Sequence, residues 1–207
     1  MDDKLLALDL STTCTGFAVF DLKTRTLEET GRLRPTTKGG VAKMVYPKQQ
    51  LTKIKDLSSQ IVALIERVRP QIIVIEEIAG SKNRLGQKTL DAMHGILWLY
   101  IEEHLDKVTY YDVTGNQGWR FHLQLRLSEA DKLANKEAKR LNKKLTPAQQ
   151  IPIIGPKHLA QRYVNATFGL SLNVDTAPTD ADVGDAVAMG AAFLSFRFAK
   201  APKFGIV

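Results

Sequence analysis

The chain has 207 residues, of which 44% are hydrophobic, and a formal net charge of +7. This length favours one domain, spanning 1–207, and there is no leader-like segment or membrane-length apolar run, so we expect a cytoplasmic protein with no membrane contact. The single cysteine, Cys14, excludes an internal disulfide framework and a cysteine-based zinc cluster. The basic charge favours an anionic partner such as nucleic acid, although excess lysine also serves solubility.

The first predicted element is a hairpin, with strands at residues 4–10 and 16–20 around a Ser/Thr-rich turn. Asp9 lies near the end of the first strand, which is apolar on both faces. A buried ionised carboxylate is so unfavourable that it must be neutralised, hydrogen bonded or bound to a cation. The alternative is that Asp9 only caps the turn that follows it.

The next elements lead to a second acidic position. Residues 26–34 favour a third strand, and apolar residues at helical spacing over 49–69 predict an amphipathic helix that ends before Pro70. The β-branched run 71–78 predicts a central strand and contains Glu76 and Glu77. Successive strand residues point to opposite faces, so only one of these two acids can join Asp9.

A helix at residues 89–105 is apolar around most of its circumference. It follows a basic loop at 79–86 and precedes a short strand at 108–113 and a polar segment at 115–120. A helix with this much apolar surface is expected to bury it on two sides, against the sheet on one side and against a second subunit on the other.

Residues 126–152 resemble an insertion in the domain. Ser128 is a predicted N-cap, with Asp131 at the third helical position, and the helix that follows is rich in lysine and has a narrow apolar stripe. Two interpretations stay open for this basic helix, a solvated surface that keeps the protein soluble and a surface that binds phosphates.

The third group of acids opens the last predicted helix, which starts at Asp180 and follows a helix at 157–168. Asp182 and Asp185 are three residues apart and share a face. Acids at a helix N-terminus are stabilised by its dipole, which accounts for Asp180 and in part Asp182. Asp185 lies in an apolar stretch, where converging carboxylates repel one another unless a divalent cation such as Mg²⁺ or Mn²⁺ binds them.

Three motifs together resemble the RuvC-type Holliday-junction resolvases, in particular their bacteriophage branch. They are Leu-Asp-Leu-Ser around Asp9, Val-Ile-Glu-Glu-Ile around Glu76, and Asp182-x-x-Asp185. The resemblance implies an α/β fold of the ribonuclease-H-like kind, a mixed five-stranded sheet flanked by helices, here with the inserted basic helix at 126–152. It also implies a homodimer through helix 89–105 and a structure-selective endonuclease that resolves four-way DNA junctions by two-metal phosphodiester hydrolysis.

The same resemblance implies roles for individual residues. The metal ligands would be Asp9, Glu76, Asp182 and Asp185, holding two Mg²⁺ ions or Mn²⁺ in their place. Lys157 would contact the reacting phosphate, and Ala79 stands where many members have an aromatic side chain. We expect DNA contacts from residues of the basic loop, the region after strand 108–113 and the basic helix: Lys82, Asn83, Arg84, Arg120, Lys136, Lys139, Arg140, Lys143 and Lys157.

Two other functions compete with this interpretation. One is a DNA-junction binding protein without catalysis. The other is an ATPase of the actin and sugar-kinase type, because Asp9 followed by Ser-Thr-Thr resembles their first phosphate loop. Those enzymes need a second glycine-rich phosphate loop, which this short chain lacks.

Overall fold

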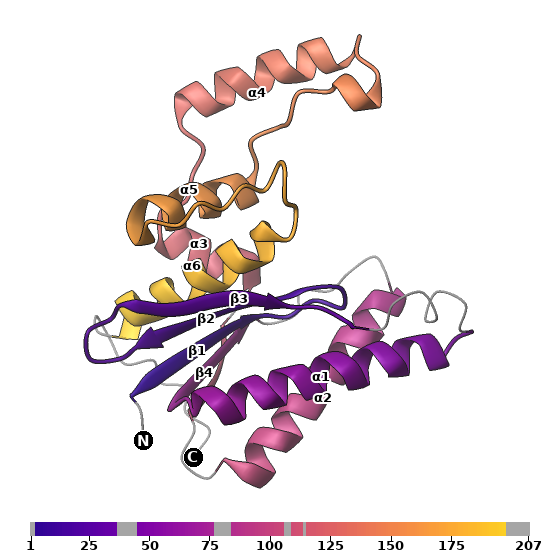
Figure 1. The fold of residues 1–207 in the computed structure, drawn as a ribbon. Helices are drawn as coiled ribbons and strands as arrows, with labels where there is room; N and C mark the ends of the chain where they lie inside the picture. The colour runs from indigo at the N-terminus through magenta and orange to yellow at the C-terminus, as the bar shows by residue number, and fades with distance from the viewer. Residues whose placement is uncertain (1–2, 37–44, 77–83, 106–108, 114, 198–207) are drawn as a thin grey trace.

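A computed structural model describes residues 3–36, 45–76, 84–105, 109–113 and 115–197. The predicted mixed α/β architecture is confirmed, with strands in the order β3-β2-β1-β4-β5 (Figure 1). β2 pairs antiparallel with both β1 and β3, whereas β4 pairs parallel with both β1 and β5. The strands are β1 (Lys4–Asp9), β2 (Thr15–Asp21), β3 (Leu27–Leu33), β4 (Ile72–Glu76) and β5 (Thr109–Val113).

Helices cover both faces of the sheet. Leu6 and Leu8 of β1 pack in a core with α1 (Lys48–Val68) and α2 (Arg84–His104). Leu5 and Ala7, which alternate with them, pack in a second core with α6 (Asp180–Arg197). Because both faces of β1 are buried, the strand is apolar on both sides up to Asp9.

Two elements differ from the sequence prediction. The helix predicted from residue 89 begins at Arg84, because Thr89 is an interior residue whose hydroxyl donates to the Leu85 carbonyl one turn earlier. The polar segment at 115–120, for which no helix was expected, belongs to helix α3 (Gly115–His122).

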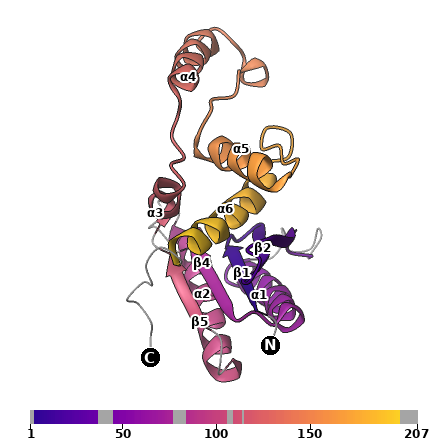
Figure 2. The ribbon, with the colours of Figure 1, turned by 90° about the vertical axis from the view of Figure 1, so that its left-hand side faces the viewer.

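The predicted insertion contains helix α4 (Glu129–Asn142), which lies away from the sheet beyond α5 (Pro156–Phe168) (Figures 1 and 2). Ser128 caps α4 as predicted, in a capping box with Asp131. The expected narrow apolar stripe is only partly buried: Ala138 is buried, Leu133 is 67% exposed, and the other buried residues of α4 are the polar Asp131 and Asn135. None of the helices in the described part of the chain has the length and apolarity to cross a membrane.

Candidate active site

Asp9 and Glu76 end two neighbouring parallel strands and lie on the same face of the sheet. Leu8 of β1 is paired with Ile75 of β4, so the acids that follow them are at the same edge. Alternation from Ala7 and Val74, both in the α6-side core, directs Asp9 and Glu76 to the α6 side. Glu77 lies outside the described residues.

Helix α6 brings Asp182 and Asp185 to this face through a close contact at Gly16. Gly16 is the β2 residue opposite Asp9. A Cβ atom added to Gly16 would lie 2.8 Å from the Val183 amide nitrogen and still closer to the carbonyl group of Asp182. The absence of a side chain at Gly16 therefore lets the first turn of α6 rest directly on the β1–β2 hairpin beside Asp9.

The electrostatics of Asp9 and Asp185 reflect a crowded, poorly solvated site. Burial raises the pKa of Asp9 well above its usual value, and the nearby carboxylates of Asp185, Glu76 and Asp182 raise it further. Burial likewise raises the pKa of Asp185 to about 6, although the Arg120 guanidinium opposes this shift. Asp9 is therefore surrounded by the three other predicted acids, which an isolated turn-capping aspartate would not be.

Two basic side chains compensate part of this negative charge. Arg120 Nη2 lies 2.7 Å from Asp185 Oδ2, and both side chains are largely buried. Lys157 Nζ, at the start of α5, lies 3.7 Å from Asp182 Oδ1 and is more than half exposed. The structure thus places Lys157 and Arg120, both predicted to contact DNA, at the acids themselves.

Trp119 is a site residue that the sequence analysis did not assign. Its indole Nε1 donates to Glu76 Oε1 at 2.9 Å, and its side chain is buried. The Arg120 guanidinium lies over the Trp119 ring, 4.1 Å from its centroid. Helix α3 therefore holds Glu76 and Asp185 through two consecutive residues. The sequence offered one signal for this contact: a tryptophan that becomes buried needs a hydrogen-bond acceptor for its indole N–H.

The donor set fits hard divalent cations, since it consists of carboxylate oxygens and Asp185 Oδ1 is buried without a hydrogen-bond partner among the described residues. As placed, however, no three of the described His, Cys, Asp and Glu side chains are close enough to share one metal ion. The contacts of Arg120, Lys157 and Trp119 take up one oxygen each of Asp185, Asp182 and Glu76.

The remaining predicted DNA contacts are on α2, on the α4 segment or outside the described residues. Arg84 is exposed at the start of α2, whereas Lys82, Asn83 and the aromatic-replacement position Ala79 lie outside the described residues. The other predicted contacts are on the separate helix α4, where Arg140 pairs with Glu137. The residues in question there are Lys136, Lys139, Arg140 and Lys143.

No protein-family model and no curated protein sequence matches this chain. Solved structures do match over nearly its whole length. RuvC from Thermus thermophilus in complex with a Holliday junction substrate has a TM-score of 0.60 at 12% identity, covering 96% of this chain and 97% of that one. The yeast mitochondrial Holliday junction resolvase Ydc2 has a TM-score of 0.52 at 14% identity, covering 95% and 81%. At these identities the similarity establishes the fold.

Proposed function

We propose that this chain, whose fold is that of the RuvC-type Holliday-junction resolvases, is a metal-dependent endonuclease that nicks four-way and other branched DNA. The observation that carries the proposal is the convergence of four carboxylates from β1, β4 and α6 on one face of the sheet. The solved RuvC structure with a junction substrate supports this choice of DNA.

Asp9, Glu76, Asp182 and Asp185 would hold two Mg²⁺ or Mn²⁺ ions, and these ions would supply the activation of a water and the stabilisation of the leaving 3′-oxygen. Two basic side chains of the protein would act on the phosphate. Lys157, which lies next to Asp182 and is more than half exposed, would neutralise charge on the scissile phosphate. Arg120 is the counter-ion of Asp185 in this structure, and it would be available to the phosphate if a metal ion replaced it at that carboxylate.

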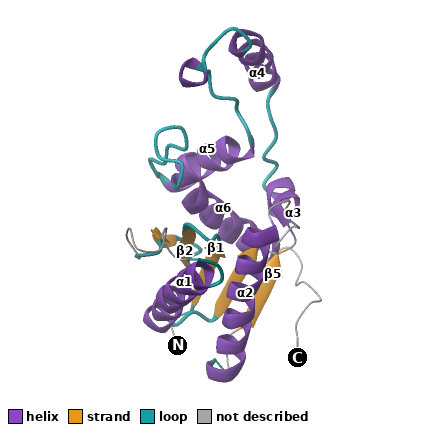
Figure 3. Ribbon diagram, turned by 90° about the vertical axis from the view of Figure 1, so that its right-hand side faces the viewer, coloured by secondary structure: helices purple, strands orange, loops and turns teal. Residues whose placement is uncertain are grey.

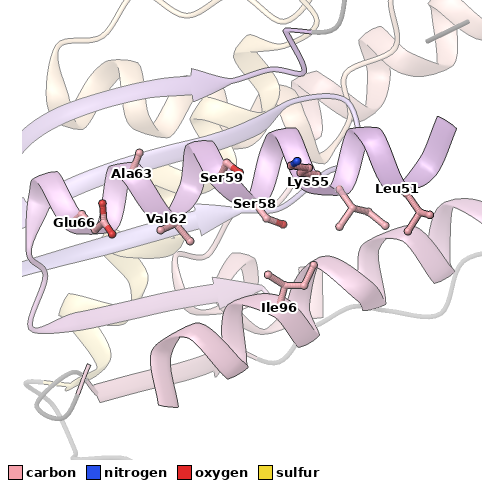
Figure 4. Close-up of a pocket in the computed structure, with 9 residues that line it drawn as sticks. Leu51, Lys55, Ser58, Ser59, Val62, Ala63, Glu66 and Ile96 are labelled. Carbon is pink, nitrogen blue, oxygen red and sulfur yellow. The ribbon is translucent and has the colours of Figure 1, made fainter. Parts of the chain in front are cut away.

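A homodimer through α2 is part of the proposal. Leu85, Ile96 and Leu99 lie along one stripe of α2 and are 43%, 39% and 62% exposed. Ile96 also lines a groove with the side chains of α1, including Leu51 and Val62 (Figure 4). A second copy of the same stripe would cover this apolar surface, and two-fold symmetry would place one site on each of two opposing DNA strands.

A labelled synthetic four-way junction tests the proposal. We expect nicking that requires Mg²⁺ and is abolished by a chelator, and we expect Asp9→Asn to remove nicking while junction binding persists. Asp91→Asn, at an exposed position of α2, is the matched control, and it should cut at the wild-type rate. Binding without nicking under all metal conditions would instead support a non-catalytic junction-binding protein. ATP hydrolysis without nicking would favour the kinase-like alternative.

The bacteriophage source and the cytoplasmic location rest on the sequence resemblance and on the absence of a membrane-length apolar run, and they stay predictions.

A further inference from the structure

Residues 126–154 form a separate structural unit, which we call the α4 arm. It consists of α4, a short 3-10 turn at Pro147–Gln149 and an extended return segment at 150–154. Two extended links join it to α3 and α5, and it stands beyond α5 from the sheet (Figures 2 and 3). The arm contains none of the four acids of the candidate site.

Two asparagines fix the return segment to α4. Asn135 Nδ2 donates to the Ile154 carbonyl and its Oδ1 accepts from the Ile154 amide, both at 2.8 Å. Asn142 forms the same pair of hydrogen bonds with Ile151, at 2.9 and 2.8 Å. The two asparagines are seven residues apart, on one face of the helix, and each amide pairs with the backbone as a neighbouring strand would. The arm is therefore held as one body.

The base of the arm is tied to the helix that carries Lys157. Asp131 accepts from the Ser128 amide and hydroxyl in the capping box and forms an ion pair with Arg162 of α5 at 2.7 Å. Hydrogen bonds from Arg162 and Ser128 lower the pKa of Asp131, so this carboxylate stays ionised at neutral pH. The position of α4 is thus linked to α5 and, through it, to the candidate site.

The face of α4 next to the asparagines is basic. Seven basic and three acidic residues give 126–154 a net charge of +4, more than half of the +7 of the whole chain. Lys132 pairs with Glu129, but Lys136, Lys139 and Lys143 are exposed and have no acidic partner among the described residues. These three lysines follow one another at helical spacings of three and four residues, so they share a face.

We propose that the α4 arm is a second phosphate-binding surface, which holds the backbone of a duplex arm of the branched substrate away from the carboxylates. The inference rests on the proposed nuclease function and names a contact that the nuclease site does not provide. A 14-residue helix is about 21 Å long, which matches about six base pairs of duplex DNA. Lysines act as point charges on phosphates, so the contact positions the duplex without reading its sequence. A helix that served only solubility would not need two asparagine clamps and an ion pair to fix its direction.

The first test removes the charge. The triple variant K136Q/K139Q/K143Q alters only exposed side chains, and K23Q/K48Q/K55Q removes the same charge from β2–β3 and α1. Junction affinity is measured by fluorescence anisotropy over a salt series, in metal-free buffer with Asp9→Asn as the background. Log affinity falls with log salt, and we expect this fall to be shallower in the arm variant. The magnitude of the slope should decrease by about 2.7, which is about 0.9 for each of three lost phosphate contacts. An arm variant whose slope equals that of the control variant would overturn the proposal.

The second test concerns the length of the duplex. Junctions with long arms should bind the Asp9→Asn protein more tightly than junctions cut to half a helical turn, and the lysine variant should lose this difference. Asn135→Ala/Asn142→Ala leaves the charge unchanged but frees the return segment, so it should lose most of the difference as well. An arm-length dependence that survives in the lysine variant would refute the inference. Failure of the wild-type protein to nick any junction would instead refute the nuclease function.

Discussion

Replacing Gly16 with alanine is the most direct test of how the site is built. Gly16 lies opposite Asp9, and its missing Cβ is the space that the first turn of α6 occupies. The obstructing atoms belong to the backbone of Asp182 and Val183, so no side-chain rotation can relieve the clash. Helix α6 or the β1–β2 hairpin has to move.

The size of the effect follows from this geometry. An alanine Cβ would lie 2.8 Å from the Val183 nitrogen and nearer to the Asp182 carbonyl, so restoring van der Waals spacing requires a shift of about 1 Å or more. Overpacking of this kind costs about 1–3 kcal/mol. For a chain of this size, 2 kcal/mol corresponds to about 4–8 °C in melting temperature. A displacement of about 1 Å at the acids should lower the nicking rate by about 100-fold.

Two measurements check this prediction, thermal unfolding by circular dichroism and single-turnover nicking of a four-way junction. Gly184→Ala is the matched control in the same turn of α6, because its Cβ would meet Leu172 at an ordinary 3.5 Å. The control should melt at or slightly above the wild-type temperature, since alanine favours helix, and should cut normally. If Gly16→Ala matches wild type in both assays, the acids do not depend on this close approach.

Three further predictions concern the acids and the dimer surface. In metal-free buffer, the raised pKa of Asp185 means that the folded protein binds this proton more tightly than the unfolded chain does. The resulting contribution to the free energy of unfolding is fully present below pH 3.8 and is lost as the pH rises to about 6. Relative to Asp185→Asn, the wild-type free energy of unfolding should therefore fall by on the order of 3 kcal/mol between pH 4 and pH 7, and parallel denaturation curves would contradict this. Trp119→Phe removes the donor to Glu76 and should weaken Mn²⁺ binding about 10- to 100-fold by calorimetry, whereas Trp98→Phe, at a half-exposed position, should bind as wild type. Leu99→Glu should convert a dimer to a monomer in sedimentation while leaving the melting temperature nearly unchanged, because this side chain is 62% exposed.

Asp9, Glu76 and Asp185 could be identified as candidates from the sequence because each is anomalous in its own element. Asp9 and Glu76 end apolar strands, and Asp185 lies in an apolar helix. A buried carboxylate is unfavourable enough to require an explanation from sequence alone. Strand alternation then indicated that Glu76 and Glu77 face opposite sides, and the structure places Glu76 on the side of α6.

The contacts around the acids could not be predicted in the same way, because they depend on packing between distant segments. The Trp119 and Arg120 contacts require α3, whose glycines disfavour a helix by local propensity. The contact of Gly16 with α6 joins positions more than 160 residues apart. On α4 the apolar pattern included the buried Ala138 but missed Asn135, because the amide of Asn135 pairs with backbone groups and hydropathy does not report such pairing.

The α4 arm leaves the domain at a point that separates it from the elements carrying the acids. In chain order the arm lies between α3, which carries Arg120, and α5, which carries Lys157. Both helices contact the acids of the candidate site. The four acids of the candidate site all lie on elements outside the arm. A change in the length or sequence of the arm would therefore leave the elements that carry these four acids in place.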